Sequence, residues 1–334
     1  MTGHTGFKGS WLVHVLKHLG AEVAGYALEP EKGSHFLLCE TEKALVQHSI
    51  GDIRDRLTLS SIFQEFKPNV VIHMAAQALV SEGYRQPYET FTTNVLGTLN
   101  VLDVSSHFDV ERVLVVTTDK VYKDEGDSKP RKEDDSLGGW DPYSSSKAAA
   151  DMVTQGWWST DRLKTKIAIA RGGNVIGGGD VSADRLIPDI ERALASGTEL
   201  TIRNPLQVRP WQHVLDCLAG YIAVITAEDG VIEDSWNIGP GLGQVETNVE
   251  TLVADYLDVR GRDLTCVVMP SAMHETEYLM LNPAKAERIL GWSSKLSSSE
   301  TIRQTAVWNR RIFDEGRDPK VETYLQIQEY FDRF

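Results

Sequence analysis

Short apolar runs recur along the first half of the chain, and segments of helical spacing lie between them. The runs have the length and composition of strands covered on both faces of a sheet; they are 22–27, 69–74, 112–117 and 166–170. The helical segments are 7–19, 57–66, 87–106 and 141–158. This alternation predicts an α/β fold with helices on both faces of a parallel sheet.

The second half of the chain has a less regular pattern. Helices and strands are predicted there at 186–196, 200–203, 214–227, 235–238 and 248–257. We therefore expect two units. Residues 1–172 would form the domain that carries the sheet, and residues 173–334 would form mainly a smaller substrate-binding lobe, with some segments returning to the sheet. Residues 123–136 carry charges of both signs, so we expect a solvated, mobile loop there.

Composition narrows the function classes. The 334 residues carry a net charge of −14, which argues against a nucleic-acid partner, because such binding needs a basic face. The three cysteines, Cys39, Cys217 and Cys266, lie far apart without zinc-like spacing, so we expect free, buried or partly buried thiols and no metal site. No apolar stretch approaches the roughly 20 residues of a membrane span. A cytoplasmic protein is expected.

A glycine-rich turn opens the chain. Gly3, Gly6 and Gly9 follow a G-x-x-G-x-x-G pattern, with Thr5 and Phe7 between them, at the head of the first predicted helix. Such glycines permit a tight turn, close approach of a pyrophosphate and close packing of helix on sheet, and the helix N-terminus attracts phosphate. Three glycines alone are common in loops, but here they begin a βαβ unit. They indicate a Rossmann-type, doubly wound sheet that binds a dinucleotide.

Further residues are candidates for the same cofactor. Glu29, after the second strand, would hold the adenosine ribose, and no arginine at that strand end would meet a 2′-phosphate, which favours NAD over NADP. A solvated loop carboxylate explains Glu29 equally well. Asp52 and Ile53 would border the adenine. The small residues Ala75 and Ala76, with Gln77, end the next strand and would let the cofactor lie against the backbone; they complete the predicted cofactor site.

The turn at Gly3 follows directly on Met1, although a Rossmann unit begins with an apolar strand before its glycine turn. The pattern indicates a misassigned start codon or a truncated chain. We expect the sheet to lack a central strand.

Tyr143 and Lys147 lie one helical turn apart and share a helix face. Asp141 and Pro142 suit the cap and first residue of that helix. A free tyrosine has a pKa of about 10, and a nearby ammonium together with a cationic nicotinamide would lower it toward that of a useful base. A surface tyrosine beside a solvated lysine would give the same spacing by chance.

Thr118, Asp119 and Lys120 follow the strand that ends at Thr117. Ligands of α/β proteins bind at the carboxyl ends of parallel strands. A hydroxyl, an acid and a base in succession are hard to explain by packing, although a capped turn with solvated charges is the alternative. We interpret the three residues, with Tyr143 and Lys147, as catalytic.

These motifs resemble the extended short-chain dehydrogenase/reductase family over nearly the whole chain. Within it the chain most resembles the nucleotide-sugar 4,6-dehydratases, and Lys120, after Thr-Asp, points to the branch that acts on CDP-glucose. The segments that carry the resemblance are TGHTGFKGSWL, GYALEP, TTDKVY, DPYSSSK, RGGNVIGGGD, DRLIPD, RPWQHVL and LNPAKAERILGW.

The resemblance implies an NAD-dependent lyase that converts CDP-D-glucose to CDP-4-keto-6-deoxy-D-glucose. Tyr143, helped by Thr118 and Lys147, would take the 4-hydroxyl proton as hydride passes from C4 to NAD. Lys120 would then take the C5 proton while Asp119 protonates the departing 6-hydroxyl, and the hydride would return to C6. Its relatives associate through helices that match 87–106 and 141–158, so a homodimer or homotetramer is expected.

Candidate ligands for the anionic nucleotide-sugar substrate lie in the second half. Arg209 is the best pyrophosphate ligand, because a guanidinium binds such oxygens bidentately. The other candidates are Asn174, Arg185, Arg203 and His213. For each arginine the alternative is a surface ion pair, and we accept this alternative for Arg203 before we accept it for Arg209. For Asn174 the alternative is a structural role as a turn residue.

Other functions share part of this pattern. A nucleotide-sugar 4-epimerase needs Tyr143 and Lys147 but not Asp119 and Lys120. A dehydratase of another nucleotide hexose also stays open, because only resemblance identifies the base of the nucleotide; the related dTDP-glucose and GDP-mannose dehydratases are expected to carry an acid where this chain has Lys120. A non-catalytic dinucleotide-binding protein needs none of them, yet the Tyr-Lys pair is intact.

Overall fold

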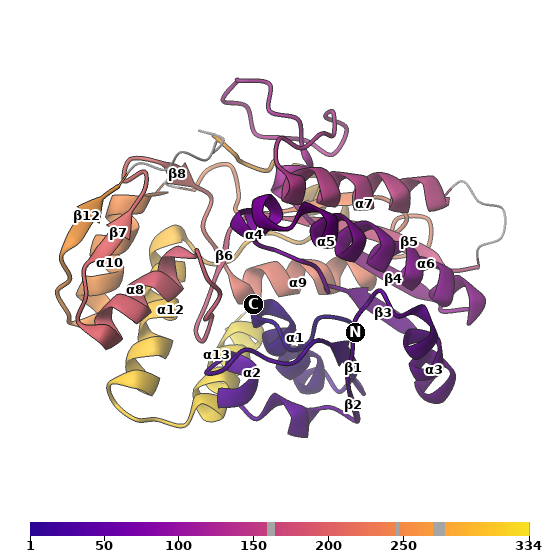
Figure 1. The fold of residues 1–334 in the computed structure, drawn as a ribbon, viewed down its shortest axis with the longest axis horizontal. Helices are drawn as coiled ribbons and strands as arrows, with labels where there is room; N and C mark the ends of the chain where they lie inside the picture. The colour runs from indigo at the N-terminus through magenta and orange to yellow at the C-terminus, as the bar shows by residue number, and fades with distance from the viewer. Residues whose placement is uncertain (159–163, 245–246, 270–277, 334) are drawn as a thin grey trace.

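A parallel sheet organises the first part of the molecule (Figure 1). The computed structural model describes residues 1–158, 164–244, 247–269 and 278–333. Strand β4 (Arg112–Thr118) pairs with β3 (Val70–His73) on one side and with β5 (Lys166–Gly172) on the other. Strand β10 (Ser235–Ile238), from the second half of the chain, pairs in parallel with β5. The predicted α/β fold with a parallel sheet is confirmed.

The first residues of the chain join this sheet to a second parallel pair, formed by β1 (Ala24–Ala27) and β2 (Gln47–Ile50). Thr2 forms a parallel bridge with Tyr26 of β1 and another with His73 of β3. The Thr2 amide donates to the Ile72 carbonyl at 3.0 Å, and the Tyr26 amide donates to the Met1 carbonyl at 3.0 Å. We expected the strand before the glycine turn to be absent. In the structure, the backbone of Met1 and Thr2 lies between β1 and β3 and forms hydrogen bonds with both strands.

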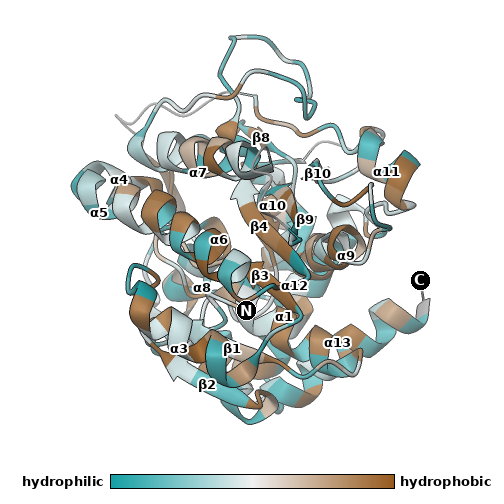
Figure 2. Cartoon of the chain, turned by 90° about the vertical axis from the view of Figure 1, so that its right-hand side faces the viewer, coloured by the Kyte–Doolittle hydropathy of each residue, from teal (hydrophilic) through white to brown (hydrophobic). Residues whose placement is uncertain are grey.

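Side chains of the central strands alternate between two cores. Leu114 and Val116 of β4 face the core formed with α1 (Phe7–His18) and α9 (Val214–Ile225). Val113 and Val115 face the core that contains residues of α3 and α6. Because both faces are covered, β4 contains an uninterrupted apolar run, and Figure 2 shows it in the hydrophobic colour between helices.

The predicted helices 57–66 and 141–158 are present as α3 and α7, whereas β2, α2, η1, α4 and η3 were not predicted. The predicted helix 87–106 is divided into α5, a π-helical turn η2 and α6. The elements are α2 (His35–Leu38), η1 (Thr41–Ala44), α3 (Arg56–Phe66), α4 (Val80–Arg85), α5 (Pro87–Phe91), η2 (Thr92–Leu96), α6 (Gly97–His107), η3 (Asp119–Val121) and α7 (Pro142–Trp158).

The second part contains a third core, shared by α8, β7, α10 and α12. Figure 1 shows these elements grouped beside the sheet. Helices α11, α12 and α13 were not predicted. The elements are β6 (Val175–Ile176), α8 (Leu186–Ser196), β7 (Leu200–Ile202), β8 (Val208–Arg209), β9 (Gln212–His213), β11 (Thr247–Asn248), α10 (Val249–Arg260), β12 (Cys266–Val268), α11 (Ala284–Leu290), α12 (Ser298–Phe313) and α13 (Pro319–Arg333). The division of the chain at residue 172 stays a prediction.

The charged loop after η3 differs from the expected mobile segment. The Arg131 side chain is only 8% exposed and forms ion pairs with Glu125 and Asp127. Its amide donates to the Met280 carbonyl at 2.8 Å, and its carbonyl accepts from the Asn282 amide at 2.8 Å. Arg131 is therefore held within the fold and anchors this loop, whereas most of its other charged residues, among them Lys123 and Lys132, are exposed as expected.

The structure also bears on the predictions for the cysteines and for membrane-spanning segments. Cys39 and Cys217 are buried free thiols, as expected, whereas Cys266 is free but exposed. No helix in the described part of the chain has both the length and the apolar character needed to cross a membrane.

Candidate active site

The glycine turn is shaped by close backbone contacts. Gly3 has φ +76°, and a Cβ there would lie 2.7 Å from the Ala75 amide nitrogen; a Cβ at Gly9 would lie 2.1 Å from the Gly3 carbonyl oxygen. Both positions therefore exclude any side chain. A Cβ at Gly6 would have its nearest neighbour at 3.5 Å, so packing inside the protein does not require glycine there. This open face at the N-terminus of α1 fits the approach of a dinucleotide pyrophosphate.

Hydrogen bonds fix two segments that are predicted to contact the cofactor. Thr5 donates its hydroxyl to the Leu28 carbonyl at 2.9 Å and ties the turn to the end of β1. The Gln77 amide donates to Asn94 Oδ1 at 2.8 Å, and Asn94 donates to the Ser146 hydroxyl of α7 at 2.8 Å. The end of β3 is thus fixed to the helix that carries Tyr143.

The other residues predicted to bind the cofactor differ in their burial and in their contacts within the protein. Phe7 and Ala76 are partly buried, Phe7 at the start of α1 and Ala76 after β3. Asp52 forms an ion pair with Arg54, which holds the pKa of that carboxyl below its ordinary value. Ile53 is 5% exposed and packs on Gly97 of α6, and Glu29 is exposed just beyond β1. Their contacts with adenosine stay predictions.

Helix α7 positions the predicted Tyr-Lys pair. It begins at Pro142, and Asp141 Oδ1 accepts a hydrogen bond from the Ser144 amide at 3.0 Å, which confirms the predicted cap. Lys147 is 6% exposed and donates from Nζ to the Val116 carbonyl at 2.7 Å. Burial, and next the nearby Lys8 ammonium, lowers the pKa of Lys147 to about 8. The lysine therefore reaches from α7 to the end of β4.

Tyr143 lies at the meeting point of three elements. Burial raises the pKa of its phenol, whereas the positive charge of Arg185 and a hydrogen bond with Thr118 act to lower it. Arg185 precedes α8, and Thr118 ends β4. Since desolvation has the larger effect, Tyr143 is a neutral phenol in this structure, and a cationic neighbour would favour its ionisation.

Asp119 is a buried acid beside the tyrosine. Its side chain is 2% exposed, and its Oδ1 accepts from the Thr118 hydroxyl at 2.9 Å. Its Oδ2 is buried without a hydrogen-bond partner among the described residues. Burial raises the pKa of this carboxyl, against the smaller opposing effects of Lys120 and Arg209. A carboxyl in this environment is suited to holding and donating a proton.

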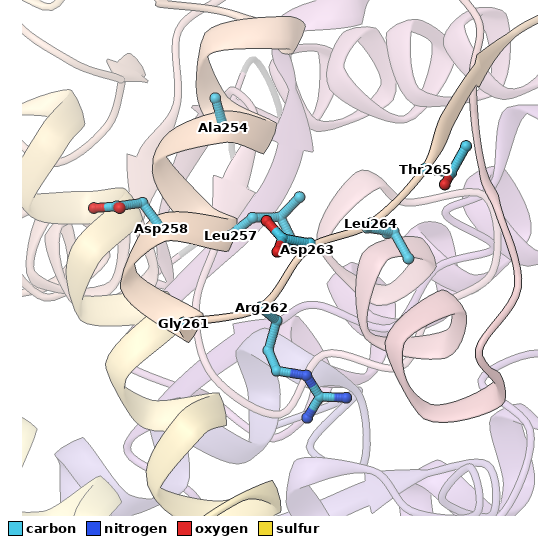
Figure 3. Close-up of a pocket in the computed structure, with 8 residues that line it drawn as sticks. All are labelled: Ala254, Leu257, Asp258, Gly261, Arg262, Asp263, Leu264 and Thr265. Atoms are coloured by element: carbon cyan, nitrogen blue, oxygen red, sulfur yellow. The ribbon is translucent and has the colours of Figure 1, made fainter.

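Lys120 follows in the turn η3 and is partly exposed. It lines a pocket beside the turn together with Arg131, Trp140, Asp141, Ser144 and Tyr278. Lys120 is thus the member of the triplet that faces a pocket, whereas Asp119 is enclosed. Another pocket, shown in Figure 3, surrounds the end of α10 between Ala254 and Thr265, and no predicted site residue lines it.

The predicted substrate ligands fall into two groups according to whether they lie near Tyr143 and Asp119. The charges of Arg185 and Arg209 act on Tyr143 and Asp119, respectively, so both arginines lie at the centre. Arg203 forms an exposed ion pair with Asp184 at 3.3 Å. A surface ion pair of this kind was the alternative to substrate binding that the sequence offered for Arg203. Asn174 is partly exposed just beyond β5.

His213 has a structural position that argues against substrate contact. It is 0% exposed, its Nδ1 accepts from the Leu215 amide at 3.2 Å at the start of α9, and its ring meets Trp11 edge-on. Burial lowers its pKa to about 3, so the ring is neutral. A polar residue near a matching motif was interpreted as a ligand, but it caps a helix instead.

The sequence analysis missed a buried charge pair behind the site. Arg171 of β5 and Asp151 of α7 are both 0% exposed, and the guanidinium also donates to the Tyr122 hydroxyl. The available signals were an arginine at the end of an apolar strand and an aspartate one turn beyond Lys147. No group of three or more His, Cys, Asp or Glu residues in the described chain is placed to hold a metal ion.

Comparison with known proteins identifies the family. The model of the "NAD dependent epimerase/dehydratase family" matches residues 1–239. This chain belongs to that family. The CDP-glucose 4,6-dehydratase of Salmonella typhimurium is 38% identical, over 99% of this chain and 95% of that enzyme. The UDP-glucose 4-epimerase of Halalkalibacterium halodurans is 28% identical, over 92% and 94%.

A solved structure shows the same fold. The Thermus thermophilus UDP-glucose 4-epimerase, in complex with NAD, superposes with a TM-score of 0.81 at 25% identity, over 93% of this chain and 97% of that one. The predicted Rossmann-type fold and the predicted NAD cofactor are both confirmed by family membership. The glycine turn described above is the part of this chain that fits the pyrophosphate of that cofactor.

Two glycine substitutions should separate packing from cofactor approach. Gly9→Ala forces a Cβ against the Gly3 carbonyl and should lower the free energy of unfolding by about 1–3 kcal/mol. Gly6 has φ −74° and ψ 169°, which alanine also adopts, so Gly6→Ala should change stability by less than about 0.5 kcal/mol while weakening NAD binding. Denaturant unfolding without NAD and NAD titration measure the two effects; equal destabilisation by both variants would contradict this assignment.

Proposed function

We propose that this protein catalyses the NAD-dependent 4,6-dehydration of CDP-D-glucose to CDP-4-keto-6-deoxy-D-glucose. The observation that carries the proposal is the succession Thr118, Asp119 and Lys120 at the end of β4, with the buried acid beside Tyr143. The similarity over nearly the full length to the Salmonella CDP-glucose 4,6-dehydratase supports this choice of substrate.

The first step is removal of the proton from the 4-hydroxyl of the glucose ring. As a phenolate, whose formation the positive charge of Arg185 favours, Tyr143 Oη accepts this proton, and Thr118, which hydrogen-bonds to Tyr143, relays or orients it. Lys147 fixes the end of β4 through the Val116 carbonyl and adds positive charge nearby. When bound, NAD would supply a reversible acceptor for the C4 hydride, and the glycine turn at Gly3 and Gly9 would hold its pyrophosphate.

The second step is elimination of water across C5 and C6. The 4-ketone acidifies the hydrogen on C5, and Lys120, as the neutral amine, takes that proton and becomes an ammonium. Asp119, whose pKa is raised by burial, donates a proton to the 6-hydroxyl as the C6–O bond breaks. Water leaves, a C5–C6 double bond forms, and return of the hydride to C6 with a proton to C5 gives the 4-keto-6-deoxy sugar without net oxidation.

The charged groups of the second part are the proposed ligands of the nucleotide diphosphate. The protein as a whole is acidic, with a net charge of −14, so an anionic substrate needs local positive charge. Arg185 and Arg209 supply it beside Tyr143 and Asp119. Asn174, near the same strand end, is the proposed sugar or phosphate contact.

A 4-epimerase is the second candidate, because an enzyme of that activity is 28% identical to this chain. Epimerisation needs oxidation and reduction at C4 but no acid at O6 and no base at C5. The buried Asp119 with its raised pKa therefore favours dehydration. A dehydratase of another nucleotide hexose would share Tyr143, Lys147 and Asp119, and a panel of substrates distinguishes it.

A substrate panel tests the proposal directly. The purified protein with NAD is incubated separately with CDP-glucose, dTDP-glucose, UDP-glucose and GDP-mannose, and products are identified by mass and NMR spectroscopy. Loss of water from CDP-glucose, with a 4-keto-6-deoxy product, is expected. A 4-epimer without water loss would instead identify an epimerase, and dehydration of another nucleotide sugar alone would reassign the substrate.

Replacement of Lys120 should separate the two steps. Lys120→Ala removes the proposed C5 base, so product formation should fall by about 10²- to 10⁴-fold while NAD binding and C4 oxidation persist. Reduced nicotinamide should accumulate on the enzyme and is measured by absorbance. Lys129→Ala, at an exposed lysine of the next loop, is the control and should keep full turnover. Unchanged turnover of Lys120→Ala would show that another group takes the C5 proton.

A homodimer or homotetramer is part of the proposal. Tyr88, Phe91 and Leu96 follow one another at about one helical turn along α5 and η2, and each is exposed, as is Met152 of the adjacent α7. Ultracentrifugation should find two or four associated chains. The variant Tyr88→Glu/Leu96→Arg should shift them to one, whereas Leu57→Arg, on exposed α3, should not.

A further inference from the structure

The buried pair Arg171 and Asp151 makes an unusually complete set of hydrogen bonds. Arg171 Nε and Nη2 donate to the two oxygens of Asp151, both at 2.8 Å. Nη1 donates to the Tyr122 hydroxyl at 2.8 Å and to the Glu133 carbonyl at 2.9 Å, and Nη2 donates also to the Ser235 hydroxyl at 3.2 Å. All five N–H groups of the guanidinium are therefore used, which fixes its position.

The pair holds both ends of the turn that carries the proposed acid and base. On one side, the Thr117 hydroxyl donates to Asp151 Oδ2 at 3.1 Å. On the other side, Tyr122 accepts from Arg171, and its own hydroxyl donates to Asn237 Oδ1 of β10 at 2.6 Å. Thr118, Asp119 and Lys120 lie between these two anchors.

The acid of this pair, Asp151, lies on the helix that carries Tyr143 and Lys147. Asp151 follows Tyr143 and Lys147 at intervals of four residues on α7, so the three share one face. Lys147 and Tyr143 are held by the helix itself, whereas Asp119 and Lys120 occupy a short turn whose ends depend on Thr117 and Tyr122. The bond from Asp151 to Arg171 therefore sets the distance between the two groups of reacting side chains.

We propose that Arg171, Asp151 and Tyr122 are positioning residues that align Asp119 and Lys120 with the C5–C6 bond of the substrate. Tyr122 and Thr117 hydrogen-bond to this pair and not to Tyr143 or Lys147, so loss of either hydroxyl should affect elimination rather than C4 oxidation. The inference rests on the proposed dehydration, since only that reaction uses Asp119 and Lys120.

The second part of the protein offers a matched control. Tyr256 is also fully buried; its hydroxyl donates to Glu191 of the buried Arg260–Glu191 ion pair at 2.6 Å and accepts from Asn309 at 2.6 Å. Tyr256→Phe thus removes the same kind of hydroxyl, between an arginine–carboxylate pair and an asparagine, but away from the proposed active site. A loss of activity through stability alone should be common to Tyr122→Phe and Tyr256→Phe.

The test compares two rates in a single turnover with NAD and CDP-glucose. One is the appearance of reduced nicotinamide, which reports C4 oxidation, and the other is formation of the 4-keto-6-deoxy product. Tyr122→Phe should slow product formation by about tenfold to a hundredfold with little change in C4 oxidation, as misplacement of reacting groups does. Tyr256→Phe should leave the ratio of the two rates at the wild-type value.

Thermal unfolding of each variant accompanies the rates. If Tyr122→Phe does not fold, Thr117→Val removes the other anchor with less disturbance, because Asp151 keeps the donors Arg171 and Gln155. It should lower the same ratio. A wild-type ratio in the folded variants, or an equal fall of both rates, overturns the positioning role. Wild-type protein that forms no dehydrated product from any nucleotide sugar overturns the proposed function itself, and the positioning role with it.

Discussion

The ion pair between Arg171 and Asp151 is the interaction on which the arrangement of the site depends. Both side chains are fully buried, and removal of such charges from water costs several kcal/mol per ion unless the remaining hydrogen-bonding groups are satisfied. Here they are satisfied by four separate segments: the end of β4, the residue after η3, the anchored loop and β10. A buried pair of this kind is weak evidence for stability, because apolar residues would fill the same space at less cost. Its geometric consequence is stronger: strands from both halves of the chain and helix α7 are brought to one fixed point behind the proposed reacting groups.

Burial also determines the protonation of the groups in front of that point. Desolvation raises the pKa of Asp119 and Tyr143 and lowers that of Lys147, so each shift moves the group toward its neutral form. A neutral carboxyl is an acid, and a phenol needs added positive charge to become a base. The arginines from the second part supply positive charge to both positions, and an anionic substrate would share it. The net negative charge of the protein and the positive charge at the site are therefore compatible, because the positive charge is confined to a few side chains beside buried acids whose pKa values are raised.

The sequence predicted the features that depend on local pattern. Strands such as β4 are covered on both faces and so contain continuous apolar runs, and α7 begins at the Asp141-Pro142 signal that caps it. Features that depend on distant partners were not predicted. The position of Met1 and Thr2 between β1 and β3 follows from pairing on both sides, and helices α12 and α13 carry many polar residues, so their apolar faces are hard to recognise. His213 was interpreted as a ligand because a motif match does not reveal that the ring is buried as a helix cap.

The distinction between dehydratase and epimerase rests on few residues, since both activities occur among relatives of the same fold. In the proposed mechanism, oxidation at C4 uses Tyr143 and Lys147, which α7 holds by its own regular backbone. Elimination needs an acid and a base in a turn of three residues, and a short turn has little intrinsic rigidity. Its orientation must therefore come from outside, through Thr117 and Tyr122. In the proposed mechanism, Asp119 and Lys120 therefore act in dehydration only while the protein behind the turn holds them in place.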